Sequence, residues 1–555
     1  MILRYSLISV SIFLTMVFTS PDLRLSAIEP EIQFQSALLK AEECRDESLL
    51  LELIGRLKPG MTKKAKQLAR AAGRISSFKS WEILSKKFAE DQELTDTLAI
   101  AARFPENSFP KARVFKIVKT FSPSPILVET LLYLNLKEAF QFALTQTQYQ
   151  SVIASNLWRA KDCLTPEIVK TYYQKTPREA VYSAYRSRTK DVVRAEEIKS
   201  TDLETRYYGC LVCDYPETFL KDPAWQVRIS AVNACNSIQA ALPLLEDDHE
   251  LVRTAALRVY LKKNGDPARI NTDLLNPMQA EIMISALKKP ALAKIFFNKK
   301  GLFSEISAPY LDSGDVNLVM SGSVSDKARI RFMENHWGKD KSRAYAKDIF
   351  KKRNSSYALQ YLLYQEDGVD KEAIVRIARE KGRFNSELQD FGYFKPVQKN
   401  RPLIFYQALL KKISGYRGFK IVTEKGTIHC DFFHRAAPQT CFNFITLVEK
   451  QYFNRVFFHR VIPAFVSQDG DPTGTGSGGP GYSIPCEYNE IEYDRIGRVG
   501  MALAGKDTGG SQYFITHLAT PHLNHQYTIF AQVVSGIDLL AELCQYDYIM
   551  EIKLY

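Results

Sequence analysis

Glycine is scarce in the first three quarters of this 555-residue chain and concentrated in the last quarter. Of its 27 glycines, twelve lie in residues 1–412 and fifteen in residues 413–555. Glycine is depleted in helices and used in turns that need a positive φ. A chain of this length also exceeds what one compact domain usually holds. We therefore expect a helical region followed by a domain rich in strands and tight turns.

Cysteine and runs of one charge are also scarce, and each absence excludes a class of protein. Nine cysteines are an odd number and too few for a disulfide-dense scaffold. With 45% hydrophobic and 25% charged residues, the composition does not fit a disordered tail, a collagen or a polytopic membrane protein. Since no run of Lys and Arg with interleaved aromatics occurs, the net charge of +12 predicts a solvated surface and no nucleic-acid partner.

Sequence clusters of metal ligands are missing as well. Cys210 and Cys213 form a C-x-x-C pair, but no βαβ pattern and no second ligand pair accompanies it, so we interpret both as apolar core residues. His517, His522 and His525 lie close together with no carboxylate or cysteine that would complete a metal shell. We therefore expect no metal and no cofactor.

The extreme N-terminus carries a short apolar segment. Arg4 is followed by an uncharged stretch over residues 5–21, whose apolar centre is shorter than the roughly 20 residues of a spanning helix. Small residues follow at Ser26 and Ala27. This arrangement predicts a secretory signal peptide over residues 1–27, with an uncleaved N-terminal anchor as the alternative. The protein is thus expected to be exported to the periplasm or cell envelope, with membrane contact only if the segment is retained.

Residues 28–412 have the pattern of an all-α solenoid. The apolar residues of 63–75 form one stripe, as on an amphipathic helix. Residues 220–232 align with residues 245–257 in the shared frame L-x-D-x-x-x-x-V-R-x-x-A, whose Asp and Arg can bond along a stack. This frame resembles a HEAT repeat. Because stacked repeats expose a long concave face, we expect the region either to bind a protein partner or to space and anchor the C-terminal domain.

Residues 413–555 predict a β-rich domain with two informative segments. Residues 419–433 alternate around a Lys-Gly turn as a β-hairpin does. Residues 457–471 read FFHRVIPAFVSQDGD, and residues 509–516 read GGSQYFIT. In this order and at this spacing, the two segments resemble the cyclophilin family of peptidyl-prolyl cis/trans isomerases, over about residues 415–555. The resemblance implies a closed eight-stranded antiparallel β-barrel with two helices and a proline-binding groove on its outer face.

The resemblance also implies which residues would act. The family's catalytic arginine falls on Arg460. The positions that contact substrate fall on Phe465, Val466, Gln468, Ala502, Leu503, Gln512, Phe514, His522, Leu523 and Tyr527. Leu503, His522 and Tyr527 stand where family members commonly have asparagine, tryptophan and histidine. None of these departures removes the arginine or the pocket aromatics.

Isomerisation of a prolyl bond needs few groups. The barrier of roughly 18–20 kcal/mol arises from lost amide resonance, and no bond breaks, so no nucleophile or metal is required. A guanidinium can donate a hydrogen bond to the amide nitrogen of the twisted state and so favour it over the planar state. The expected function is isomerisation of X-Pro bonds in exported, unfolded or flexible proteins. The alternative is a scaffold or chaperone-like protein whose barrel binds proline peptides with little turnover.

Overall fold

The computed structural model describes residues 30–58, 60–104, 108–189, 193–198, 202–365, 369–381, 388 and 401–555. The signal peptide or anchor expected over residues 1–27 lies outside these ranges. Within them, no helix combines the length and the apolarity that a bilayer crossing requires.

Helices build almost all of the described chain between residues 30 and 413, which we call the array. Many begin where an Asp or Ser side chain accepts a hydrogen bond from the backbone three residues on, as Asp46, Ser77 and Asp91 do. Gly338 interrupts α22 with a φ of +77°. The helices are α2 (Pro30–Cys44), α3 (Glu47–Gly55), α4 (Thr62–Arg74), α5 (Phe78–Lys87), α6 (Gln92–Ala101), α7 (Lys111–Val118), α8 (Pro125–Leu134), α9 (Lys137–Leu144), α10 (Gln150–Asn156), α11 (Pro166–Lys175), α12 (Pro177–Ser187), α13 (Ala195–Ile198), α14 (Leu203–Cys210), α15 (Trp225–Cys235), α16 (Ile238–Ala241), α17 (Glu250–Lys262), α18 (Pro277–Leu287), α19 (Pro290–Asn298), α20 (Leu302–Ser307), α21 (Val316–Ser321), α22 (Asp326–Arg353), α23 (Ser356–Gln365), α24 (Val369–Lys381) and α26 (Leu403–Ile413).

The repeated sequence frame forms ion pairs along the stack. Arg228 in α15 donates two hydrogen bonds of 2.8 Å to the carboxylate of Asp247, which belongs to the next copy of the frame. Arg206 pairs in the same way with Asp222 at 3.0 Å. Helices α14, α15, α17 and α18 contact one another in that order. The expected bonding along the stack is therefore confirmed, whereas the HEAT-like classification stays a prediction.

Cys210 is the last residue of α14, and Cys213 lies three residues beyond the end of that helix. Cys210 is buried and Cys213 half-buried against the same hydrophobic cluster. Cys210 and Cys213 form no disulfide, with each other or with another cysteine. Over the described ranges, no three His, Cys, Asp or Glu side chains are grouped closely enough to hold a metal ion.

The C-terminal part is one curled antiparallel sheet in the order β3-β4-β6-β5-β7-β2-β1-β8. The predicted hairpin at residues 419–433 is confirmed, because β1 and β2 pair around Gly426. Ring contacts of Phe444 with Phe419, Tyr513 and Phe530 form its interior. We call this sheet and its two helices the barrel. Its elements are β1 (Gly418–Thr423), β2 (Gly426–Phe432), α27 (Pro438–Glu449), β3 (Arg460–Ile462), β4 (Val466–Asp469), β5 (Arg498–Met501), β6 (Tyr513–Thr516), β7 (Ile529–Ser535), α28 (Leu539–Glu542) and β8 (Ile549–Leu554).

The expectation of a fully closed barrel needs correction. The edge strands β3 and β8 share no ladder, so the sheet is open between them. Instead, the segment that precedes β3 meets the first residue of β8 and the turn before it. Phe458 N–H donates to Asp547 O at 2.9 Å, and Ile549 N–H donates to Val456 O at 2.8 Å. Because β3 has only three residues, the gap is bridged by the irregular backbone that precedes β3 and by the start of β8.

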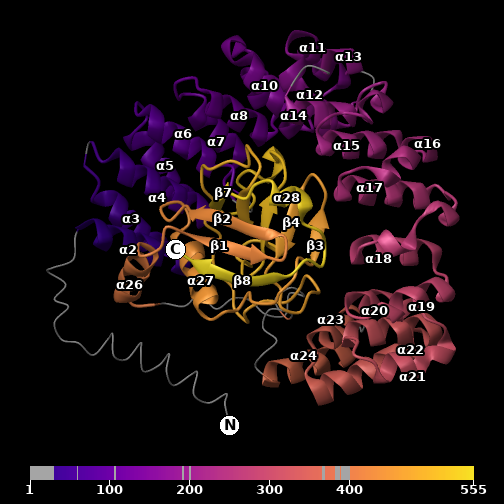
Figure 1. Ribbon diagram of the computed structural model, residues 1–555. Coiled ribbons are helices and arrows are strands. Elements are labelled where there is room, and N and C mark those ends of the chain that lie inside the picture. The colour runs from indigo at the N-terminus through magenta and orange to yellow at the C-terminus, as the bar shows by residue number, and fades with distance from the viewer. Residues whose placement is uncertain are drawn as a thin grey trace.

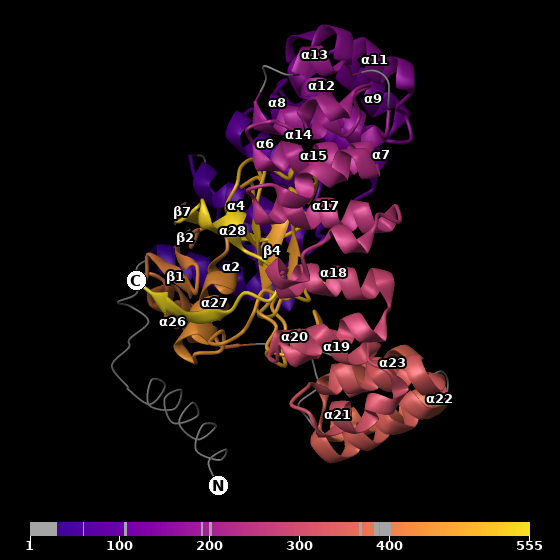
Figure 2. The same ribbon diagram turned by 45° about the vertical axis from the view of Figure 1, so that its right-hand side comes forward.

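The array curves around the barrel and contacts it at many points. Figures 1 and 2 show the helices as an arc with the sheet on its inner side. Tyr208 of α14 donates a hydrogen bond to Ala519 O at 2.8 Å, and Trp225 of α15 packs on His517. The last array helix, α26, contacts both α2 and α27. The proposed domain boundary at residue 412 therefore lies inside a helix that joins the two parts.

Candidate active site

Three predicted site residues lie side by side because of strand register. Arg460 in β3 is paired with Gln468 in β4, and Gln468 is paired with Phe514 in β6. Directly paired residues present their side chains on the same face of a sheet. The short hairpin between β3 and β4 thus brings the arginine, the glutamine and the phenylalanine together on one face.

A directed chain of hydrogen bonds holds the polar side of this face. Arg460 Nη1 donates to Gln468 Oε1 at 3.0 Å, and Gln468 Nε2 donates to Gln512 Oε1 at 3.0 Å. Gln512 Nε2 in turn donates to the carbonyls of Gly476 and Gly478 at 2.8 and 2.9 Å. Within the described ranges, the guanidinium of Arg460 makes no other hydrogen bond. Partial burial lowers the pKa of its guanidinium. The remaining N–H groups are available to a ligand.

Next to this chain lies an apolar pocket. Val466, Phe514 and Leu523 are buried in one cluster, against which Phe465 and Ala502 pack. The ring of Tyr527 meets Phe514 edge-on at 5.5 Å. A side chain at position 500 would meet Phe514 Cζ at 2.5 Å, so Gly500 is what lets the phenylalanine ring occupy this place.

His522 joins the pocket to the array. Its ring stacks on Phe465 at 5.5 Å, and its Nδ1 shares a hydrogen bond of 3.0 Å with the hydroxyl of Tyr182 in α12. Burial lowers the pKa of His522 to about 4, with a further contribution from Arg186 and Arg159. The imidazole is therefore neutral at pH 7, and the pocket wall gains no charge from it.

A buried charge network lies behind the loop that carries Leu523 and Tyr527. Glu129 of α8 pairs with Arg103 at 2.9 Å and with Arg159 at 2.8 Å. Arg103, which is only 1% exposed, also lies 3.3 Å from Nε2 of His525. The other ring nitrogen of His525 lies 3.0 Å from Asn489 O. Since a carbonyl only accepts, Nδ1 carries the proton and Nε2 accepts from Arg103. Array residues thereby fix the position of the loop.

The pKa of Glu129 reflects this arrangement. Burial raises it, but the two arginines outweigh burial and hold the pKa at about 2. Burial, reinforced by Arg103, lowers the pKa of His525 to about 3. The carboxylate is therefore charged and the imidazole neutral at any pH at which the protein would be assayed.

Replacing His525 with Gln should remove part of the acid sensitivity of the fold. An unfolded histidine titrates near 6.5, so between about pH 6.5 and 3 the unfolded chain binds a proton at this position and the folded chain does not. Stability therefore falls as the pH drops, by about 2 kcal/mol at pH 5 from this group. Urea unfolding at pH 7.5 and pH 5 measures it. The loss on acidification should be smaller in His525→Gln than in the wild type or in the control His336→Gln. Equal losses in all three proteins would contradict the assignment.

The structure brings together all eleven residues that the sequence singled out, along one side of the barrel. Arg460, Gln468 and Gln512 form the polar chain, and the others line the apolar pocket or its border. The sequence missed Tyr493, whose ring stacks on Phe514 at 5.7 Å, and Tyr182. Tyr493 lies in a loop with no periodic pattern, and Tyr182 is 340 residues from its partner. No local signal marks either residue.

Comparison with known proteins identifies the barrel. Residues 418–551 match the family model described as cyclophilin type peptidyl-prolyl cis-trans isomerase/CLD. A peptidyl-prolyl cis-trans isomerase of Synechococcus elongatus is 46% identical over 134 residues, which are 24% of this chain and 92% of the relative. Peptidyl-prolyl cis-trans isomerase B of Bacillus subtilis is 42% identical over 137 residues, 24% of this chain and 96% of the relative. The solved structure of a Cryptosporidium parvum cyclophilin type isomerase is 34% identical, covers 25% of this chain and 98% of its own, and has a TM-score of 0.25. Through residues 418–551, the chain belongs to the family of cyclophilin-type peptidyl-prolyl cis-trans isomerases.

Proposed function

We propose that Arg460 is the catalytic residue and that the apolar pocket holds the proline ring of the substrate. The observation that carries this proposal is the guanidinium of Arg460, whose one hydrogen bond in the described part of the chain goes to the neutral Gln468. No carboxylate competes for it there. A cation without a counter-ion, beside a dry pocket built on Phe514, can stabilise a transition state in which the lone pair localises on the proline nitrogen.

The geometry suggests how the barrier is lowered. Phe465, Phe514 and Leu523 would exclude water around the ring, and Gln512 would orient the peptide backbone. As the amide twists, its nitrogen becomes pyramidal and basic, and Arg460 donates a hydrogen bond to it. To shorten the time constant of isomerisation from tens of seconds to milliseconds, the activation free energy must fall by roughly 5–6 kcal/mol. One charge-assisted hydrogen bond, together with desolvation and orientation of the substrate, can lower the barrier by this amount.

We further propose that the substrates are exported, unfolded or flexible polypeptides and that the array is HEAT-like. The basis for export is the composition of residues 1–27. The N-terminal sequence of the mature protein tests it, since an intact segment 1–27 on a protein found inside the cell would contradict it. The basis for a HEAT-like array is the repeated frame with its Arg228–Asp247 pair.

Turnover by the full-length chain separates an isomerase from a proline-binding scaffold. We expect the protein at micromolar concentration to accelerate cis/trans exchange of a short, uncharged Ala-Pro peptide well beyond spontaneous exchange, which takes tens of seconds. Exchange spectroscopy on the peptide resonances measures both directions at equilibrium. Binding of the peptide without faster exchange would favour the scaffold.

A further inference from the structure

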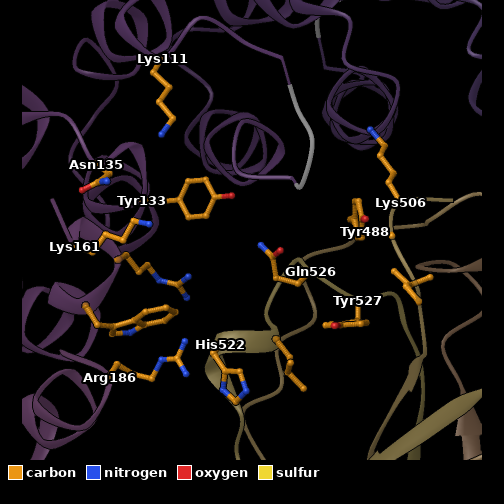
Figure 3. Close-up of a pocket in the computed structure, with 15 residues that line it drawn as sticks. Lys111, Tyr133, Asn135, Lys161, Arg186, Tyr488, Lys506, His522, Gln526 and Tyr527 are labelled. Atoms are coloured by element: carbon orange, nitrogen blue, oxygen red, sulfur yellow. The ribbon is translucent and has the colours of Figure 1, made fainter. Parts of the chain in front are cut away.

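A cavity of about 720 Å³ lies between the array and the barrel. Its barrel wall includes Leu503, His522, Leu523 and Tyr527, four of the residues that define the proline-binding side. Its opposite wall comes from α7, α8, α12 and the short turn at residues 157–161. Figure 3 shows array side chains such as Tyr133, Lys161 and Arg186 directed toward the loop that carries His522 and Gln526. We call this cavity the cleft. It continues the groove of the barrel onto the array.

The cleft is strongly basic. Of the described residues that line it, five are cations and none is an acid; the cations are Lys111, Arg159, Lys161, Arg186 and Lys506. Arg159 is already paired with Glu129. Lys111, Lys161 and Arg186 are exposed, and over the described ranges none of the three has a carboxylate within ion-pair distance. A concave surface lined by one sign of charge concentrates the field and attracts the opposite charge.

The cationic wall is built with defined geometry. The guanidinium of Arg186 lies 5.0 Å from the centre of the Trp158 ring, and that of Arg159 lies 4.5 Å from it. Trp158 also packs edge-on against Tyr182, which is hydrogen-bonded to His522. The cations are thus connected through aromatic contacts to the wall of the proline pocket. Contact with an aromatic ring restricts the guanidinium without neutralising it.

We propose that the array supplies a second substrate subsite that selects X-Pro segments flanked by Asp or Glu. This inference rests on the proposed function of the barrel, because the occupant must be a polypeptide whose proline enters the adjacent pocket. Leu503, Leu523 and Tyr527 belong both to the cleft and to the proline-binding side of the barrel. This sharing favours one continuous polypeptide as the occupant over a small anion bound separately. The half-buried Trp158 and Tyr133 provide apolar contact for the flanking side chains. Several such cations acting together are expected to raise kcat/KM for acidic X-Pro segments about tenfold, even though salt screens each of them in part.

Three peptides that differ only in flanking charge test the proposal on the full-length protein. Each has a central Ala-Pro and carries three Glu, three Gln or three Lys within four residues of the proline. We expect kcat/KM to decrease in the order Glu, Gln, Lys, with a Glu-to-Lys ratio of about tenfold or more at low salt. The ratio should fall toward one in 0.5 M NaCl. Equal rates for the three peptides, with the Gln peptide turned over, would overturn the subsite and leave the proposed function intact. No turnover of the Gln peptide would refute the proposed function itself.

Charge reversal locates the selectivity. In the double variant Lys161→Glu/Arg186→Glu, the Glu-to-Lys ratio should fall to about one or invert. The matched control Lys170→Glu/Lys289→Glu removes the same charge from exposed positions outside the cleft and should keep the wild-type ratio. If the cleft variant fails to fold, the salt dependence of the wild-type ratio still decides. Equal ratios in both variants, or stronger competition by an RNA oligonucleotide than by a Glu-rich peptide, would contradict the proposal.

Discussion

Arg460→Ala is expected to lower kcat/KM for a short X-Pro peptide by about 100-fold or more while the fold stays intact. Loss of one hydrogen-bond donor aimed at the transition state costs roughly 10²–10³ in rate in other enzymes. The side chain is partly exposed, and its one hydrogen bond in the described part of the chain goes to Gln468, so the barrel core does not depend on it. Binding of the ground state should change less than turnover.

Two further variants sharpen this result. Arg435→Ala removes another exposed arginine of the barrel, one that lies outside the site, and should retain wild-type turnover. Arg460→Lys keeps the charge but loses the planar array of donors, so we expect partial activity. Full turnover by a folded Arg460→Ala protein would show that the guanidinium is not the catalytic group.

Glu129→Ala is expected to destabilise the protein by about 3–5 kcal/mol. The change leaves the guanidinium of Arg103 and that of Arg159 buried without their shared carboxylate. The midpoint and slope of the urea transition measure the loss. Because Arg103 also holds His525, the loop with Leu523 and Tyr527 should loosen, and KM should rise in the folded variant.

The control for this variant is Glu138→Ala, an exposed acid on α9. We expect it to change stability by less than about 0.5 kcal/mol, as surface substitutions do. A loss of under about 1 kcal/mol for Glu129→Ala would mean that water or another group compensates the two arginines, and that the charge network does not fix the loop.

The sequence predicted what depends on short-range pattern. Strand alternation and the turn at Gly426 were sufficient for the first hairpin. Arg460, Gln468 and Phe514 were predicted only through the family resemblance, and the strand register of the structure shows why they lie together. The Arg228–Asp247 pair followed from a repeat of 25 residues. Closure of the sheet was predicted too simply, since a three-residue β3 leaves most of the closing bonds to irregular backbone.

Contacts between the array and the barrel could not be predicted in the same way. Tyr182 and His522 are 340 residues apart, and Arg103 and His525 are 422 apart. Arg103 is a charged residue that is almost completely buried, against the usual preference of arginine for the surface. Its counter-ion and its histidine come from two other parts of the chain. Neither periodicity nor a motif indicates such a network, and the basic cleft beside it depends on the same packing.

The central claim is that the barrel groove and the array wall form one substrate site, and photo-crosslinking tests it most directly. A peptide with a central Ala-Pro, flanking Glu residues and a benzophenone side chain within four residues of the proline is bound to the full-length protein, irradiated and digested. We predict crosslinks to the array wall, within residues 111–186, as well as to the barrel near His522 and Tyr527. Addition of excess Ala-Pro peptide should abolish both. Crosslinks confined to residues 418–551 would contradict the claim and leave the array outside the site.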